Sequence, residues 1–362
     1  QQGKLFFDDN NEFGNEAFVA AAAGKRSPQI NKRSYKGDFQ LRAEQGDKLL
    51  VVNRLPLENY LASVLPAKTM VVWPDEVIKA QAVAARSYAM HKMEQSKNAY
   101  ALLATDKELP YEGTGKRIEK SAVTKLIQAT KGQYLADAYG RAIEAVTTSS
   151  TGGRTESALN LWGTPVSYLQ SVEDYDSDSP EYTWERRVSP AFLEGLLAQR
   201  GYAAGKLTSI RLSPLDDAGV DRTPTGRVKY IILSGEAATV KISGDELVEL
   251  LGLNSALFEL ETGTPVPETL KVPIEDYYGM EIGSKDIDIK VNESKKPVWK
   301  NLVRSYHLLG GGKEEKIIFH GKGKGSGLGL SAWGARGLAN ADAKATYKTI
   351  LAHYYPGAKL VR

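Results

Sequence analysis

Two stretches of the chain combine polar side chains and small residues at spacings that suit a binding or catalytic groove. The first, residues 73–90, reads WPDEVIKAQAVAARSYAM. A proline in a first helical turn costs no hydrogen bond, and the acids behind Pro74 favour the positive end of the helix dipole. We therefore predict a helix from Pro74 to Glu94, although the same apolar spacing also fits an ordinary core helix. Its candidate binding residues are Lys79, Gln81, Arg86 and Tyr88.

The second stretch, residues 147–163, reads TTSSTGGRTESALNLWG and combines hydroxyl groups with two adjacent glycines. Glycines permit close backbone approach and unusual φ values. Hydroxyl and backbone N–H groups can meet sugar hydroxyls or N-acetyl carbonyls, and a tryptophan can offer an apolar ring face. A strand that ends in a glycine turn is the structural alternative. The candidate binding residues here are Ser149, Ser150, Gly152, Gly153, Thr155 and Trp162.

Other site chemistries have little support in the sequence. A serine nucleophile would need Ser149 or Ser150 beside a neutral Lys68, but the chain contains neither G-x-S-x-G nor S-x-x-K. The four histidines are scattered, cysteine is absent, and no H-E-x-x-H occurs, so we expect no metal and no cofactor. The glycine-rich run at 321–329 lacks the order of a phosphate loop, so we expect no nucleotide.

Several ordered segments resemble the SpoIID/LytB family, the stage II sporulation protein D and amidase-enhancer proteins of bacterial cell walls. These segments cover residues 55–70, 78–89, 122–135, 148–157 and 161–172, and those at 319–339 and 347–360 are similar to the family's C-terminal signature. The resemblance implies action on peptidoglycan, with sporulation members behaving as lytic transglycosylases on glycan strands stripped of peptides. That reaction needs a carboxylic acid that protonates the glycosidic oxygen and then, as carboxylate, takes the C6 hydroxyl proton.

The chain departs from the family pattern at the positions that carry this chemistry. Where the family reads Pro-Ala-Glu-Met-Pro, residues 66–70 read PAKTM, so the catalytic glutamate is replaced by Lys68. A lysine with a pKa of about 10.4 stays cationic at neutral pH and cannot serve as the base. Ser326 and Ala332 likewise replace the family's histidine and glutamine. We therefore expect impaired catalysis, as in a pseudoenzyme, or, if the register is displaced, an acid supplied by Glu76 or Asp75 at the helix start.

Composition narrows the class of protein. Lysine and arginine number 47 against 44 acidic residues, so nucleic acid is not an expected partner. The absence of cysteine and of any apolar run near 20 residues fits an exported protein. We expect it to be extracytoplasmic (secreted, periplasmic or cell-wall associated), with a signal peptide or anchor that is not part of this sequence.

Residue patterns predict an α+β fold of mixed helices and antiparallel sheet. Alternating segments predict strands at 4–7, 39–43, 48–52, 133–135 and 142–149, and helical spacing predicts helices at 57–65, 122–130, 190–199 and 244–251. The SpoIID/LytB-like core would combine residues 1–205 and 301–362. A β-rich subdomain, residues 206–300, would be inserted between them. Its stretch 265–300 is expected to be a loop, with a mobile linker or an edge contact as alternatives.

Three functions follow from the resemblance and its departures. The first is a glycan-strand binding or remodelling protein with impaired catalysis. The second is an active lytic transglycosylase that uses another acid, and the third is an amidase enhancer that contacts a cell-wall amidase directly. In each case we expect one groove to gather Lys68, Lys79, Gln81, Ser149, Ser150 and the 325–329 loop.

Overall fold

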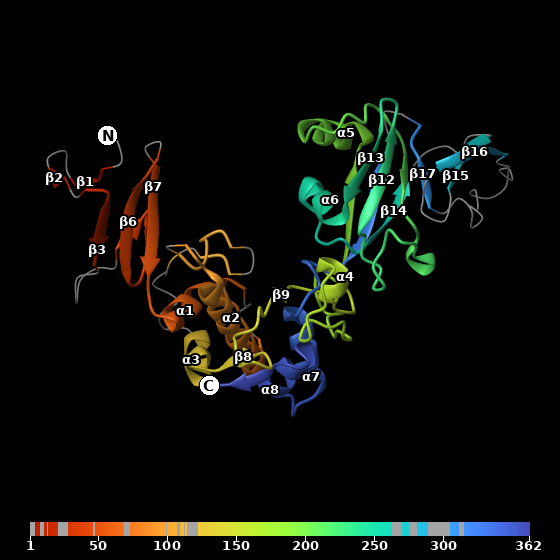
Figure 1. Ribbon diagram of the computed structural model, residues 1–362. Coiled ribbons are helices and arrows are strands. Elements are labelled where there is room, and N and C mark those ends of the chain that lie inside the picture. Colours follow the sequence, from red (N-terminus) through yellow and green to blue (C-terminus); the bar gives the residue numbers. More distant parts are fainter. Residues whose placement is uncertain are drawn as a thin grey trace. The chain divides into compact units, whose positions relative to one another are not determined.

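The computed structural model describes the chain apart from residues 1–3, 8–10, 13, 21–27, 46–47, 69–72, 99, 107–108, 112, 114–121, 263–268, 276–280, 289–304 and 311–314. It is an α+β protein, as predicted, with two compact units (Figure 1). One comprises residues 1–179 and 327–362, and the other residues 180–326. We call them the first and second units and describe each separately.

The first unit begins with short antiparallel strands. A three-stranded sheet has the order β3-β6-β7 (Figure 1). The predicted strands at 39–43 and 48–52 correspond to β6 and β7, which pair from Asp38 opposite Arg54 to Glu44 opposite Lys48. The strands are β1 (Phe6–Phe7), β2 (Asn11–Glu12), β3 (Glu16–Val19), β4 (Gln29–Ile30), β5 (Arg33–Ser34), β6 (Asp38–Glu44) and β7 (Lys48–Arg54).

Helices α1 (Leu57–Lys68), α2 (Asp75–Gln95) and α3 (Ala122–Ala129) follow the sheet. Pro74 is the N-cap of α2 rather than its first residue, and Asp75 and Glu76 occupy the first turn. The alanines of α2 are buried, which lets α1, α3 and α8 (Tyr347–Tyr354) pack closely around it. In the described part of the chain, no helix is long and apolar enough to cross a membrane.

Segments from both ends of the chain complete the first unit. Strand β8 (Tyr134–Ala136) pairs antiparallel with β20 (Lys359–Val361), and β9 (Thr147–Thr148) pairs in parallel with β19 (Leu330–Ser331). Helices α4 (Ala158–Trp162) and α7 (Ala332–Ala341) flank this junction. The core of the unit is therefore shared between residues far apart in the sequence.

The predicted strand at 142–149 is wrong for most of its length. Only β9 is a strand there, and Ala142 makes a single bridge to Ala136. Between them, the backbone N–H of Ala145 donates to Ile143 O at 2.9 Å, and that of Val146 donates to Glu144 O at 2.8 Å. These local bonds use groups that a continuous ladder would need.

The second unit is built on two antiparallel sheets, with strand orders β10-β18-β14 and β13-β12-β11-β17. Phe258 and Phe319 lie at the centre of its apolar core. Helices α5 (Pro190–Gln199) and α6 (Gly244–Leu251) have the predicted bounds. The strands are β10 (Thr183–Val188), β11 (Leu207–Arg211), β12 (Tyr230–Gly235), β13 (Thr239–Ser243), β14 (Phe258–Thr262), β17 (Tyr306–Leu308) and β18 (Ile317–Lys322).

The loop predicted over 265–300 is wrong in part, because it contains a β-hairpin of β15 (Thr269–Glu275) and β16 (Glu281–Asp288). Pro273 lies within β15, and a two-stranded hairpin has outer edges at which a missing N–H breaks no ladder. The rest of that stretch lies largely outside the described residues. The subdomain expected over 206–300 lies inside the second unit, which also takes in β10, α5 and β18.

Candidate functional site

The first turn of α2 holds Glu76, the alternative acid. Lys79 Nζ lies 2.6 Å from Glu76 Oε1, and the backbone N–H of Tyr347 donates to Oε2 at 2.7 Å. Burial alone would raise the pKa of Glu76, but the hydrogen bonds from Lys79 and Tyr347 and the charge of Lys79 together lower it. Glu76 is therefore held as a carboxylate and is a poor proton donor at neutral pH.

Arg86 lies in the interior, with its side chain only 1% exposed. Its guanidinium forms two parallel bonds to the Glu58 carboxylate, Nε to Oε1 at 2.9 Å and Nη2 to Oε2 at 2.8 Å. Nη1 also donates to Gln133 O at 2.8 Å. This bidentate pair joins α1 to α2 and to the residue before β8, so in this structure Arg86 holds helices together.

Gln81 and Tyr88 are also buried on α2. The Tyr88 hydroxyl donates to Asp106 Oδ2 at 3.1 Å. Gln81 Oε1 is buried and has no hydrogen-bond partner among the described residues. Of the four binding candidates on this helix, Lys79 is the one with substantial exposure, about a quarter of its side chain.

One carboxylate, that of Asp176, holds the glycine loop at 150–153 in place. Asp176 Oδ2 accepts hydrogen bonds from Ser150 Oγ, from Thr151 N at 2.6 Å and from Gly152 N at 2.8 Å. Gly152 and Gly153 have φ values of 82° and 107°, a region that side chains rarely adopt. Ser150 and Asp176 are fully buried, so the hydroxyl shapes the loop instead of pointing into solvent.

A second carboxylate, Asp174, lies in the same interior. Its Oδ2 accepts from Thr151 Oγ1 and its Oδ1 from the Tyr354 hydroxyl, both at 2.6 Å. Burial, followed by the charge of nearby Asp176, raises the pKa of Asp174 despite these bonds. A methyl group at Gly334 would fall 1.6 Å from Asp174 Oδ1, so α7 needs a glycine there.

The C-terminal segment at 327–331 lies directly on the 147–156 segment. Glu156 N donates to Gly327 O at 2.8 Å, Gly327 N donates to Thr148 Oγ1 at 3.3 Å, and β9 pairs with β19. Thr155, buried beside this junction, donates through Oγ1 to Gln170 O at 3.2 Å. Both segments overlap stretches that resemble the SpoIID/LytB family, and the structure brings them into contact.

The tryptophan before α2 also reaches this junction. The rings of Trp73 and Trp333 have centroids 5.6 Å apart, and Trp333 N donates to Ser149 O at 3.0 Å. The start of α2, the hydroxyl segment and α7 therefore meet at Trp333. Trp162, at the end of α4, is 47% exposed.

Lys68 lies at the end of a helix, and Ser326 lies at the end of a unit. Lys68 is the last residue of α1, and its side chain lies outside the described part of the structure. Ser326 is exposed at the end of the second unit, one residue before the chain returns to the first. The single groove expected to gather all candidates therefore stays a prediction. Among the described residues, no three acids or histidines are grouped so that they could hold a metal.

The acids that hold the glycine loop in place were not among the residues predicted from the sequence. Asp174 and Asp176 lie in the acidic run EDYDSD at 173–178. In an extended chain, residues two apart point to the same side, so these two carboxylates can face the same neighbour. Nothing local connected that run to residues 150–152. Glu58, the partner of Arg86, is likewise 28 residues away in the sequence.

The chain is similar in sequence to one protein family and to several individual proteins. The family model described as SpoIID, stage II sporulation protein, matches residues 45–136. The chain is 28% identical over 334 residues to an uncharacterised protein of Brachyspira hyodysenteriae, a match that covers 92% of this chain and 73% of that protein. It is 25% identical over 306 residues to the amidase enhancer of Bacillus subtilis, covering 83% of this chain and 40% of the enhancer.

A third relative is the stage II sporulation protein D of Bacillus subtilis, which is 27% identical over 226 residues. That match covers 58% of this chain and 61% of the relative. The chain therefore matches less than two thirds of the length of either Bacillus subtilis protein.

Proposed function

We propose that this chain, which belongs to the SpoIID/LytB family, is a cell-wall remodelling protein that binds peptidoglycan glycan strands and has impaired catalysis. The observation that carries the proposal is Lys68. It lies within the matched segment 45–136 and ends α1, and the resemblance aligns it with the family glutamate. An ammonium group cannot donate and then retrieve a proton near neutral pH as a carboxylic acid does.

The surroundings of the alternative acid support the same conclusion. Glu76 is tied to Lys79 and to the backbone of Tyr347, and its pKa is lowered. A general acid in glycoside cleavage needs the opposite, a raised pKa that keeps the proton available. Asp174 has a raised pKa, but it is buried and engaged by Thr151 and Tyr354.

Glycan binding is supported by the 147–163 segment. Its two glycines are partly exposed and leave the backbone open to close approach, and Trp162 follows with nearly half of its side chain exposed. A sugar ring stacks on such a face while backbone and hydroxyl groups meet its polar edge. The carboxylate of Asp176 holds the loop in shape before any ligand arrives.

Co-sedimentation with insoluble glycan strands stripped of peptides tests this binding. We expect the wild-type chain to sediment and Trp162→Ala to bind about tenfold more weakly, because one aromatic platform carries about 1.4 kcal/mol. Tyr139→Ala is the matched control, since Tyr139 is 83% exposed in the same unit but lies outside the segment. A wild-type chain that stays in solution, or equal losses in both variants, would refute the proposal.

Amidase enhancement is the second candidate, because a relative that matches 83% of this chain carries the name amidase enhancer. In that case the chain would raise the activity of a cell-wall amidase through protein contact. Stimulation of a purified amidase by wild-type chain and by Trp162→Ala alike, without sedimentation on glycan, would favour this function over the first.

A further inference from the structure

Two buried aspartates, Asp174 and Asp176, bind the same loop from the interior of the first unit. Asp176 is 0% exposed and Asp174 is 8% exposed. Both contact Thr151: Asp176 Oδ2 accepts from its backbone N–H at 2.6 Å, and Asp174 Oδ2 accepts from its hydroxyl at 2.6 Å. The two carboxylates are close enough for the charge of one to act on the other.

One oxygen of this pair, Asp176 Oδ1, is buried and has no hydrogen-bond partner among the described residues. The other oxygen of the same carboxylate accepts three bonds, from Ser150, Thr151 and Gly152. A buried carboxylate oxygen without a donor is costly, because the interior does not replace the water that it loses. A protonated carboxyl group at Asp174 would supply a donor to this oxygen.

The surroundings of Asp174 disfavour a second negative charge. Burial acts most strongly on its carboxyl, followed by the charge of Asp176, and together they raise its pKa. Hydrogen bonds from Thr151, Tyr354 and Ser331 oppose this shift without reversing it. Two carboxylates in one buried site do not ionise independently, so the pair keeps its first proton to higher pH than an ordinary aspartate does.

The cations of the neighbouring segments make other contacts. Arg154, which follows the two glycines, donates through Nε to Ser171 Oγ at 3.1 Å. Arg336, the charged residue of α7, lies over the ring of Trp333, 5.0 Å from its centroid. Neither arginine is among the groups that shift the pKa of Asp174, so within the described part of the chain the pair has no counter-charge from them.

Two titratable rings of α8 also lie near the pair. The Tyr354 hydroxyl donates to Asp174 Oδ1 at 2.6 Å, and the ring of His353 lies 4.8 Å from the ring of Tyr354. Burial and the charge of Asp174 raise the pKa of Tyr354, so this hydroxyl stays neutral in acid. A histidine changes its charge between about pH 5 and pH 8, so His353 needs a control of its own.

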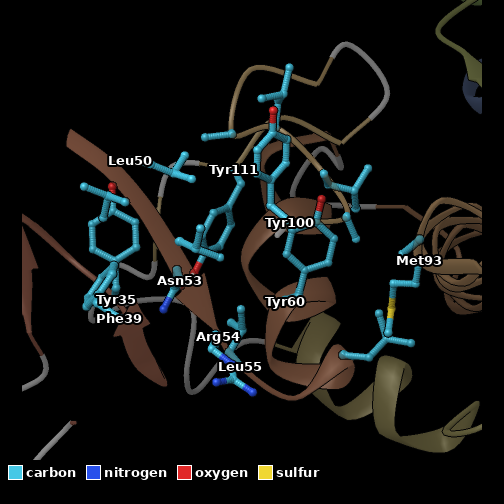
Figure 2. Close-up of a pocket in the computed structure, with 18 of the residues that line it drawn as sticks. Tyr35, Phe39, Leu50, Asn53, Arg54, Leu55, Tyr60, Met93, Tyr100 and Tyr111 are labelled. Carbon is cyan, nitrogen blue, oxygen red and sulfur yellow. Dashed lines mark hydrogen bonds between the residues drawn. The ribbon is translucent and has the colours of Figure 1, made fainter. Parts of the chain in front are cut away.

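A pocket elsewhere in the first unit does not contribute to this titration. Figure 2 shows its wall, which includes Tyr60 and Tyr111, and its volume is about 580 Å³. Its described lining residues all lie between Ile30 and Tyr111 in the sequence, outside the aspartate segment. Burial raises the pKa of both tyrosines, that of Tyr111 to about 12, so both stay neutral in the acid range.

We propose that Asp174 and Asp176 hold one proton between them, and that loss of this proton as pH rises loosens the 150–153 loop and weakens glycan binding. The inference rests on the proposed glycan binding, because it concerns the regulation of the same loop. With the proton present, the pair carries one negative charge. When the proton passes to water, two charges repel each other at Thr151, which both aspartates hold.

NMR of isotope-labelled aspartate carboxyl groups tests the proton directly, with Asp174→Asn to identify the signal of Asp174. We expect Asp174 to lose its proton above the ordinary aspartate value of 3.8. Because its folded pKa is raised, the folded chain binds the proton before the unfolded chain does, and the resulting stability is lost as pH rises through the folded pKa. A signal that titrates at or below 3.8 would overturn the shared proton.

Co-sedimentation with glycan strands between about pH 4 and about pH 8 tests the effect on binding. We expect wild-type binding to fall about tenfold as pH rises, and Asp174→Asn, which carries no charge there, to bind equally across the range. Asp178→Asn, exposed in the same acidic run, and His353→Gln should keep the wild-type profile. Wild-type binding that ignores pH, or a pH dependence that disappears in His353→Gln, would contradict the proposal.

Tyr354→Phe keeps the test decisive if Asp174→Asn does not fold. The Tyr354 hydroxyl favours the charged form of Asp174, so its removal should raise the pKa of Asp174 further and move the loss of binding to higher pH. An unchanged midpoint would count against the pair. A chain that binds no glycan at any pH would refute the proposed function, while the NMR titration would still decide whether the pair holds a proton.

Discussion

At the scale of single residues, the buried pair of Arg86 and Glu58 shows how a residue in a family motif serves the fold. The pair lies between α1 and α2, and Arg86 is almost fully buried. Removing one member of such a pair leaves a charge without its partner in a medium that solvates it poorly. A role in stability therefore accounts for Arg86 without any contact to substrate.

Arg86→Met should lower the free energy of unfolding by about 3 kcal/mol, because Glu58 then stays buried as an unpaired carboxylate. Urea denaturation followed by circular dichroism measures the loss. Arg141→Met is the matched control, since Arg141 also pairs with a carboxylate, that of Asp137, but is 64% exposed. Similar losses in the two variants would show that burial does not set the strength of the pair.

Glu76 should make stability depend on acid pH. Its folded pKa lies below the ordinary value of 4.5, so the unfolded chain takes up the proton first. The stabilisation is present above that value and is lost as pH falls through the folded pKa. Glu76→Gln should therefore lower the melting temperature at pH 7 and match wild type at low pH, with Glu94→Gln on the exposed face of α2 as control. A deficit that persists unchanged into acid would disprove this electrostatic role.

At the scale of elements, glycines set the contact between the C-terminal segment and β9. Gly329 has a φ of 66°, and a Cβ atom there would lie 2.1 Å from Val146 O. Gly163, at the end of α4, has a similar φ of 72° but nothing within 4 Å of a Cβ. A side chain at Gly163 would therefore meet only backbone strain, whereas one at Gly329 would also collide with a neighbouring backbone atom.

Gly163→Ala should cost about 1 kcal/mol of stability from strain alone. Gly329→Ala should cost about 3 kcal/mol or more, because backbone must also move away. Thermal unfolding of both variants gives the comparison. Equal melting temperatures would mean that the junction of β9 and β19 tolerates displacement.

Several elements could be predicted because their signals are local. Helices α5 and α6 each follow a serine whose side chain accepts from the first turn, Ser189 and Ser243, and both helices have the predicted bounds. The shortened strand at β9 and the β15–β16 hairpin could not be predicted, since the partners of a strand and its position in a sheet depend on the whole fold. Likewise Asp176 reaches Thr151 across 25 residues, which no local pattern reveals.

At the scale of the whole molecule, the second unit is an insertion with its own core. Thr183 and Lys322 are opposite each other in the β10–β18 ladder, so the chain enters and leaves this unit side by side. A separate apolar cluster around Phe258 and Phe319 supports the unit. Residues 180–326 should therefore fold alone and unfold cooperatively in calorimetry. A fragment without a thermal transition would show that the first unit is needed for its stability.

The central claim is that this chain binds glycan strands while Lys68, in place of the glutamate of the SpoIID/LytB pattern, impairs cleavage. Mass spectrometry of glycan strands stripped of peptides, after incubation with wild-type chain or with Lys68→Glu, tests it most directly. We predict anhydro-muramyl products with Lys68→Glu and none above background with wild type. Release of those products by the wild-type chain would contradict the account and would require another acid.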